Sequence, residues 1–126
     1  MAISVVKRPL SGQADHGLHI GLTAATDTGT VVHTCAPSST AVWDTVYLYA
    51  NNSTTSAFDI EMSVGSTAAG NRLIFPVPAR AFNYPIIEGL DMWGIAASTG
   101  TVLKAGYGAA SASLYVYGYF TRYTES

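Results

Sequence analysis

The sequence carries little charge, a single cysteine and no long apolar run. Only 11% of its 126 residues are charged, where about 25% is typical of globular domains. A formal net charge of −2 without a basic cluster argues against a nucleic-acid-binding surface, because binding to phosphates needs grouped Lys and Arg. No apolar run approaches the ~18 residues of a membrane-spanning helix, so no membrane partner is expected. Cys35 cannot form an internal disulfide, which suits a reducing compartment.

Helical patterning is also missing. Ala-rich pieces such as GIAASTG are interrupted by Gly and Ser and show no apolar stripe at helical spacing. Short strand-like runs recur instead, among them GTVVHTC, DTVYLYA, AFDIEMSV and ASLYVYGYFTRY, with turn signals such as NNSTT and ASTG between them. The pattern predicts an all-β chain, in which residues 1–126 form a single antiparallel β-sandwich, jelly-roll-like, of about eight strands.

Strict alternation of apolar and polar residues identifies the expected core. In the run from Phe58 to Val64, every second residue is apolar, as in a strand with one face on a core. The same alternation occurs in the runs that begin at Val46 and at Leu114. The predicted core residues are Val46, Leu48, Phe58, Ile60, Met62, Leu114, Val116 and Phe120.

The first twelve residues do not alternate, and Pro9 and Gly12 interrupt any strand pairing. We therefore interpret residues 1–12 as an extended N-terminal arm that lies outside the sandwich and anchors the protein to a partner. Deleting this arm is expected to leave the fold intact. The residues expected to make the anchoring contact are Lys7, Arg8, Pro9 and Leu10.

Tyrosines occupy the alternate positions of two strands, opposite the predicted core residues. Rings in such a row suit a subunit interface, because tyrosine offers a rigid apolar ring with a polar tip. A charge-poor surface also favours coverage by copies of the chain or by a larger assembly. Two alternatives are plain cross-strand packing and a platform on which sugars or bases stack. The predicted oligomer interface consists of Tyr47, Tyr49, Tyr115, Tyr117 and Tyr119.

Motifs of the common catalytic families are missing: the sequence has no glycine-rich phosphate loop ending in Lys-Ser/Thr, no HExxH and no nucleophile elbow. Asp15, His16 and His19 lie close together, but zinc needs three or four ligands and no second cluster lies near in sequence. We expect neither a metal nor any other cofactor. The tip NNST is formally a glycan acceptor, and we interpret it as a solvent-facing turn.

Two residue pairs resemble parts of an active site. Cys35 and His33 share a predicted strand face, as a Cys-His-acid group would require, and Asp59 with Glu61 could form a glycosidase-like carboxylate pair. The first pair is explained by Cys35 as a buried small residue with His33 as its strand neighbour. The second pair is explained as the polar face of a strand. We therefore predict that the protein is not an enzyme.

Several short motifs together carry a family resemblance. They are Leu10-Ser11-Gly12, Gly29-Thr30, His33-Thr34, Trp43-Asp44, Tyr47-Leu48-Tyr49-Ala50, Asn51-Asn52 and the ending GYFTRY, Gly118 to Tyr123. With these motifs the chain resembles small virion structural proteins of tailed bacteriophages. The stretch GIAASTGTVLKAGYGAASAS departs from that pattern.

The resemblance implies a capsid decoration, or cement, protein. Such a protein is a β-sandwich, often a homotrimer, that sits on the outside of the assembled shell and reinforces it. The expected partners are copies of the chain and the major capsid protein, and the expected location is the virion surface after assembly in the bacterial host cytoplasm. The alternative is a receptor- or glycan-binding module of a tail or fibre.

Overall fold

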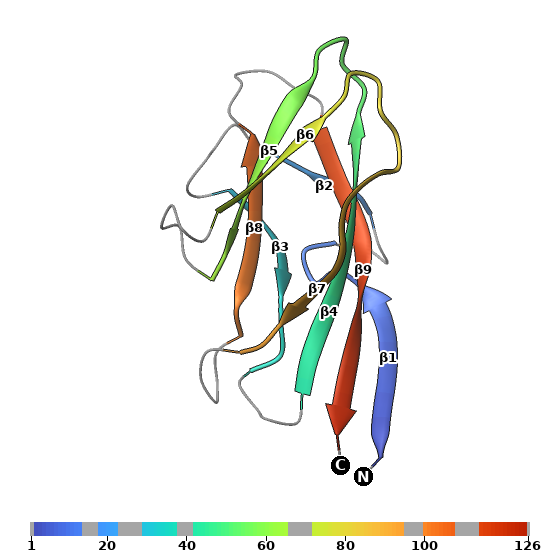
Figure 1. The fold of residues 1–126 in the computed structure, drawn as a ribbon, viewed down its shortest axis with the longest axis vertical. Helices are drawn as coiled ribbons and strands as arrows, with labels where there is room; N and C mark the ends of the chain where they lie inside the picture. The colour runs from blue at the N-terminus through green and yellow to red at the C-terminus, as the bar shows by residue number, and fades with distance from the viewer. Residues whose placement is uncertain are drawn as a thin grey trace.

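A computed structural model describes residues 2–13, 18–22, 29–37, 42–65, 72–94, 100–107 and 114–125. All regular structure in these residues is β-strand, arranged as two antiparallel sheets that pack face to face (Figure 1). The all-β prediction is therefore confirmed. The strands are β1 (Ile3–Pro9), β2 (Ile20–Gly21), β3 (Thr30–Thr34), β4 (Val42–Asn52), β5 (Phe58–Val64), β6 (Arg72–Val77), β7 (Tyr84–Met92), β8 (Val102–Tyr107) and β9 (Leu114–Glu125).

Strands β2 to β9 have the order of a jelly roll. The first sheet contains β2-β9-β4-β7, and the second sheet contains β3-β8-β5-β6. This is the strand order of the eight-stranded, double Greek-key sandwich, as predicted. One further strand, β1, extends the first sheet. It pairs with β9, as β2 does, but with a later part of that strand.

The core lies between the two sheets and is filled by the inward residues of the alternating strands. Every predicted core residue is buried except Phe58, which is half-buried and packs against the core. The alternation therefore assigned the facing of β4, β5 and β9 correctly. Further buried residues come from segments without clean alternation, and they include Leu10, Val32, Val77, Met92 and Leu103.

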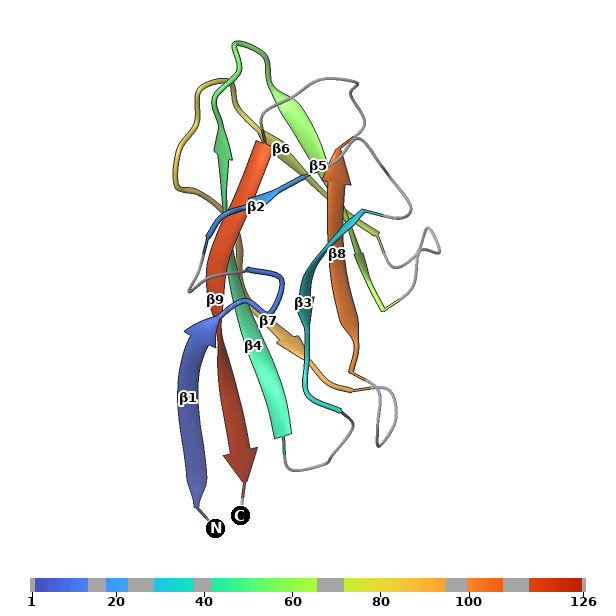
Figure 2. The same cartoon turned by 180° about the vertical axis from the view of Figure 1, so that it is seen from behind.

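The predicted N-terminal arm is not separate from the sandwich. Residues Ile3–Pro9 form β1, which pairs antiparallel with β9 from Ile3 opposite Glu125 to Pro9 opposite Tyr119. Figures 1 and 2 both show β1 at the outer edge of the sheet, beside the C-terminal half of β9. All seven residues of β1 are exposed, and this explains why the sequence shows no alternation there.

Beyond β1 the chain enters the core. Leu10 is 1% exposed, so it cannot anchor the protein to a partner, and this part of the prediction is wrong. The next residues cross to the second sheet, where the Gly12 amide donates to the Val32 carbonyl at 2.9 Å. A Cβ on Gly12 would lie 2.3 Å from the Val31 carbonyl oxygen, which only glycine avoids. Deletion of residues 1–12 is therefore expected to destabilise the fold.

The placement of Leu10 gives a direct test. Leu10→Ala should destabilise the protein by about 2–5 kcal/mol, because it removes a buried side chain and leaves a cavity. Val6→Ala on the exposed β1 is the control and should cost less than about 1 kcal/mol. Urea unfolding followed by circular dichroism measures both. Equal, small effects would place Leu10 at the surface and restore the picture of a free arm.

Candidate functional site

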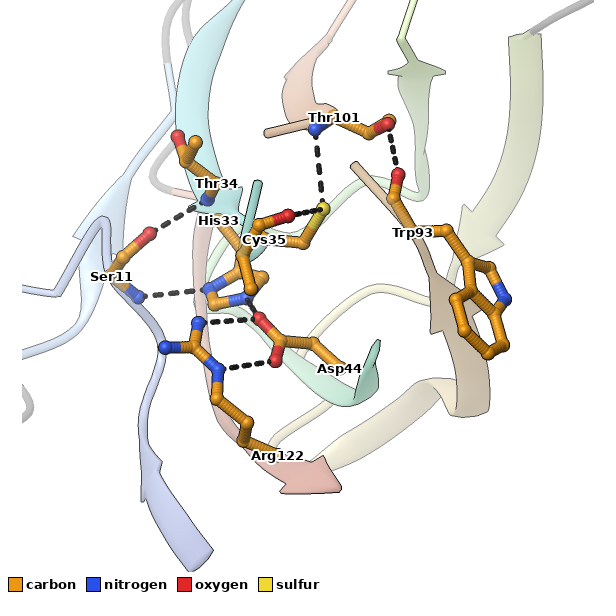
Figure 3. Close-up of polar contacts among 9 residues, drawn as sticks. Ser11, His33, Thr34, Cys35, Asp44, Trp93, Thr101 and Arg122 are labelled. Atoms are coloured by element: carbon orange, nitrogen blue, oxygen red, sulfur yellow. Dashed lines mark hydrogen bonds and ion pairs between the residues drawn. The ribbon is translucent and has the colours of Figure 1, made fainter. Parts of the chain in front are cut away.

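Asp44 is a buried carboxylate at an inward position of β4, in phase with the core residues of that strand. His33 Nε2 on β3 lies 2.8 Å from Asp44 Oδ2. Arg122 on β9 donates from Nε to Oδ1 at 2.7 Å and from Nη2 to Oδ2 at 2.9 Å (Figure 3). Charge-assisted hydrogen bonds of this kind are what make a buried carboxylate tolerable. Asp44 therefore ties the second sheet to the first.

The hydrogen bonds of His33 indicate which ring nitrogen carries a proton. Its Nδ1 accepts the backbone N–H of Ser11 at 3.1 Å, so its Nε2 carries the proton and donates to Asp44. The Ser11 hydroxyl is turned away from the ring and accepts the Thr34 N–H at 2.7 Å (Figure 3). Ser11, His33 and Asp44 thus lack the hydrogen-bond order of a serine nucleophile, its base and its acid. The buried polar cluster of Ser11, His33, Asp44 and Arg122 is a structural tie.

Cys35 does not pair with His33. Its Sγ accepts the Thr101 N–H at 3.2 Å and donates to the Ala36 carbonyl at 3.4 Å (Figure 3). Burial raises the pKa of the Cys35 thiol despite the hydrogen bond from Thr101. A thiol with a raised pKa carries little of the nucleophilic thiolate. Cys35 is therefore a buried small residue, and the Cys-His interpretation has no hydrogen bond to support it.

The other polar candidates are dispersed. Asp59 is exposed and Glu61 half-buried on β5, in the second sheet. His19 is exposed, whereas Asp15 and His16 lie outside the described residues. Within the described ranges, no group of three or more His, Cys, Asp or Glu could hold a metal ion. The same part of the chain contains no helix long and apolar enough to cross a membrane.

The NNST tip is organised by Asn52. This residue is buried, and its side-chain amide donates to the carbonyls of Ser56 at 2.9 Å and Pro78 at 3.0 Å. Its Oδ1 accepts the backbone N–H of Thr54 at 3.0 Å. Asn52 thus holds the β4–β5 turn against the end of β6, and its buried amide is not accessible to glycosylation. Asn51 is also engaged, since its Oδ1 accepts the Asn83 N–H at 2.9 Å.

The outer face of the first sheet carries most of the aromatic residues. Strands β4 and β9 pair so that Tyr47 lies opposite Tyr119 and Tyr49 opposite Tyr117. The tyrosines of the two strands therefore lie on one sheet. We call this surface the aromatic face, and its members are His19, Trp43, Tyr47, Tyr49, Trp93, Tyr115, Tyr117, Tyr119 and Tyr123.

The rings stack in rows that run across the strands. In one row Trp43 lies between Tyr123 and Trp93, with ring centroids 5.2 and 5.0 Å apart. A second row pairs Tyr47 with Tyr119 at 4.8 Å. These ring planes lie within 26° of each other, so the faces of the rings cover one another.

A third row contains Tyr117 between His19 and Tyr49, at centroid distances of 4.1 and 5.8 Å. The Tyr119 ring of the second row is also covered on one side, because Lys7 Nζ lies 4.0 Å from its centroid. Stacked rings of this kind turn their edges and hydroxyls, rather than their faces, toward solvent. Partial burial raises the pKa of Tyr49 and of Tyr117, which favours the neutral form of both phenols.

Gly118 makes the close pairing of these strands possible. It lies between Tyr117 and Tyr119 on β9 and opposite Leu48 on β4. A Cβ at this position would lie 2.0 Å from the Tyr47 carbonyl oxygen. Only glycine lets the two backbones approach here, and this approach brings the rings on either side within stacking distance.

Comparisons of the chain with protein-family models, with curated proteins and with solved structures found no match.

The buried polar cluster predicts a specific acid sensitivity. Burial alone would raise the pKa of the Asp44 carboxyl, but hydrogen bonds from Arg122 and His33 outweigh it and hold the pKa below the ordinary 3.8. A carboxyl whose pKa is lower in the folded state stabilises the fold above its unfolded pKa. This stabilisation is lost as the pH falls below 3.8 and through the folded-state pKa.

Asp44→Asn should therefore lower the free energy of unfolding by about 1–3 kcal/mol at neutral pH, because the hydrogen bonds from His33 and Arg122 lose their ionised acceptor. The difference from the unmodified protein should shrink as the pH falls below 3.8. Asp59→Asn removes an exposed carboxylate and serves as the control, with little effect on stability at any pH in the series. Urea unfolding at a series of pH values measures all three proteins. A cost that does not change with pH would mean that Asp44 is not ionised in the fold.

Proposed function

We propose that this protein is a bacteriophage capsid decoration protein, which binds the outside of the shell and reinforces it. The stacked aromatic face is the observation that carries the proposal. Its partners would be further copies of the chain, as a homotrimer, and the major capsid protein. The mechanism is binding rather than catalysis: many modest contacts, repeated over a lattice, add up to high avidity.

The geometry of the aromatic face favours a protein partner. Sugars and bases bind aromatic side chains through the faces of the rings, and here the inner rings of the rows, Trp43, Tyr117 and Tyr119, are covered by their neighbours. The stacked rings leave their edges and hydroxyl groups for contact, and Trp93 and Tyr115 add exposed aromatic surface beside them. Tyrosine and tryptophan in this arrangement are typical of the centre of protein–protein interfaces.

The positions of the resemblance motifs also support the proposal. Ser11 from the Leu-Ser-Gly motif, His33, Asp44 from the Trp-Asp motif and Arg122 from the ending GYFTRY meet in the buried polar cluster. These motifs are far apart in the sequence, yet they form one structural unit. Proteins that share a fold would retain the residues that hold it together. The motifs therefore support the resemblance more strongly together than singly.

Three of the four residues predicted to contact the capsid are exposed. Lys7, Arg8 and Pro9 are exposed on β1, at the outer edge of the first sheet. The second candidate function, a glycan- or receptor-binding module, draws on a hollow beside them. The hollow has a volume of about 420 Å³, and its lining includes Lys7, Arg8, Tyr117 and Tyr119. Lys7 lies over one of the two rings, and a cation beside aromatic rings would suit an acidic sugar.

Copy number separates the two functions. Particles assembled with the protein should contain hundreds of copies if it decorates the capsid, and a few to tens if it belongs to a tail or fibre. Quantitative gel analysis of purified particles against the major capsid protein gives this ratio. A low number, together with binding to acidic oligosaccharides, would favour the alternative.

Tyr117, which stacks on both sides, tests the aromatic face as an interface. Tyr117→Ser should shift the isolated protein from oligomer toward monomer, because central aromatic anchors contribute about 2 kcal/mol or more. Tyr117→Phe keeps the ring and is the matched control, with an unchanged assembly state. Sedimentation velocity measures both variants. An unmodified protein that sediments as a monomer and keeps these rings exposed on the particle would show that the row only packs the sheet.

A further inference from the structure

The two outer strands of the first sheet, β1 and β7, are both open edges. Among the described strands, β1 pairs only with β9 and β7 only with β4. Open edges offer unpaired backbone N–H and C=O groups, and proteins commonly shield them with proline, charge or bulges. β7 is partly shielded by Pro85, by its carboxylates and by two irregularities in its pairing with β4, and the C-terminal half of β1 by Lys7, Arg8 and Pro9. The N-terminal half of β1 has none of these devices, and Ile3 and Val5 are each 55% exposed. Such a strand is a site for pairing with another chain.

The two edges carry opposite charge. Lys7 and Arg8 are exposed on β1, which has no acidic residue, whereas Glu88 and Asp91 are exposed on β7. Two β1 strands side by side would bring only cations together. An edge formed by β1 is therefore complementary to an edge formed by β7 and repels a second β1.

The strand directions allow these edges to meet between copies. The order β1-β9-β4-β7 is antiparallel at every step, so β1 and β7 run in opposite directions. A second copy in the same orientation therefore brings its β1 antiparallel to β7 of the first copy, with both aromatic faces on the same side. No inversion of either copy is needed.

Side chains match in the register that continues the rows of the sheet. One row runs from Lys7 through Thr121 and Thr45 to Asp91, so Lys7 of the next copy would follow Asp91. The neighbouring row starts at Val5 opposite Tyr123 and ends at Trp93, which is 47% exposed. The next Val5 would pack beside that indole. This register thus joins a cation to a carboxylate and an exposed valine to an exposed tryptophan.

We propose that copies of this chain associate edge to edge, with β1 of one copy added antiparallel to β7 of the next. The contact is head-to-tail, so it closes into a ring when the rotation between copies permits. Each copy then makes two such contacts, and closure strengthens them jointly. The aromatic face continues from copy to copy, and Lys7 contacts the neighbour rather than the capsid. The inference concerns the isolated protein and is independent of attachment to a capsid. It places the contact between copies at the sheet edges, away from Tyr117, so here Tyr117→Ser should leave the oligomer intact, whereas an interface on the aromatic face predicts its loss.

Cysteine cross-linking tests the contact and its direction. Lys7→Cys and Asp91→Cys variants are refolded together in equal amounts and oxidised, and non-reducing gels are then read. A covalent dimer should form in the mixture and in neither variant alone. The unmodified protein controls for Cys35, which is buried. Lys7→Cys mixed with Asp59→Cys, an exposed position on the other sheet, is the matched control and should give no dimer.

Two results would overturn the proposal. Dimers of Lys7→Cys alone would show that two β1 strands meet, and no dimer in any mixture would show that β1 and β7 do not. In the second case, β1 would remain free to pair with a strand of the capsid. A cross-link from Lys7→Cys to the major capsid protein on particles would identify that contact.

Charge reversal provides an independent measurement. Lys7→Glu and Asp91→Lys should each raise the dissociation constant of the oligomer about tenfold, because each one places like charges together. The double variant restores an opposite pair between copies and should return the dissociation constant to within about threefold of the original. Sedimentation at several concentrations gives these constants, and circular dichroism checks the fold. Equal loss in the double variant would reject the register.

Discussion

The buried carboxylate of Asp44 is the constraint on which the sandwich depends. A carboxylate that loses its partners inside a protein costs several kcal/mol. Asp44 can therefore be buried only if β3 delivers His33 and β9 delivers Arg122 at the same place. His33 in turn holds the Ser11 amide, which draws the segment after β1 across the open side of the sandwich. Apolar packing alone tolerates many arrangements, whereas the hydrogen bonds of Asp44 require His33 and Arg122 to lie at one place.

The same constraint determines the outer face. Asp44 lies opposite Arg122 in the pairing of β4 with β9, and further along the same register Tyr47 lies opposite Tyr119 and Tyr49 opposite Tyr117. A slip of one residue would turn every side chain to the other face, which would break the ion pair inside and the ring stacks outside together. Gly118 adds a steric condition, since a side chain there would meet the Tyr47 carbonyl. The inner ion pair and the outer rings thus specify one register.

Alternation in the sequence was sufficient to predict the sandwich, the core residues of β4, β5 and β9, and the outward tyrosines. It could not predict β1, because a strand exposed on both faces has no reason to alternate. It also missed the buried polar cluster, whose members lie 11 and 78 residues apart. A signal was present: Asp44 is in phase with Val46 and Leu48, and Arg122 is in phase with Phe120. A charge at an inward position needs a buried partner, and only the fold reveals which one.

The few charged residues of the chain are not spread evenly over the first sheet. Asp44 and Arg122 are paired with each other, and Lys7 lies over the Tyr119 ring. On the first sheet the exposed cations lie on β1 and the exposed carboxylates on β7, with neutral aromatic rings between them. A surface with this polarity fits a copy beside it in the same orientation better than one related by a two-fold axis, which would set like edges together. The placement of a few charges at the two edges of the sheet therefore supports the head-to-tail association that we propose.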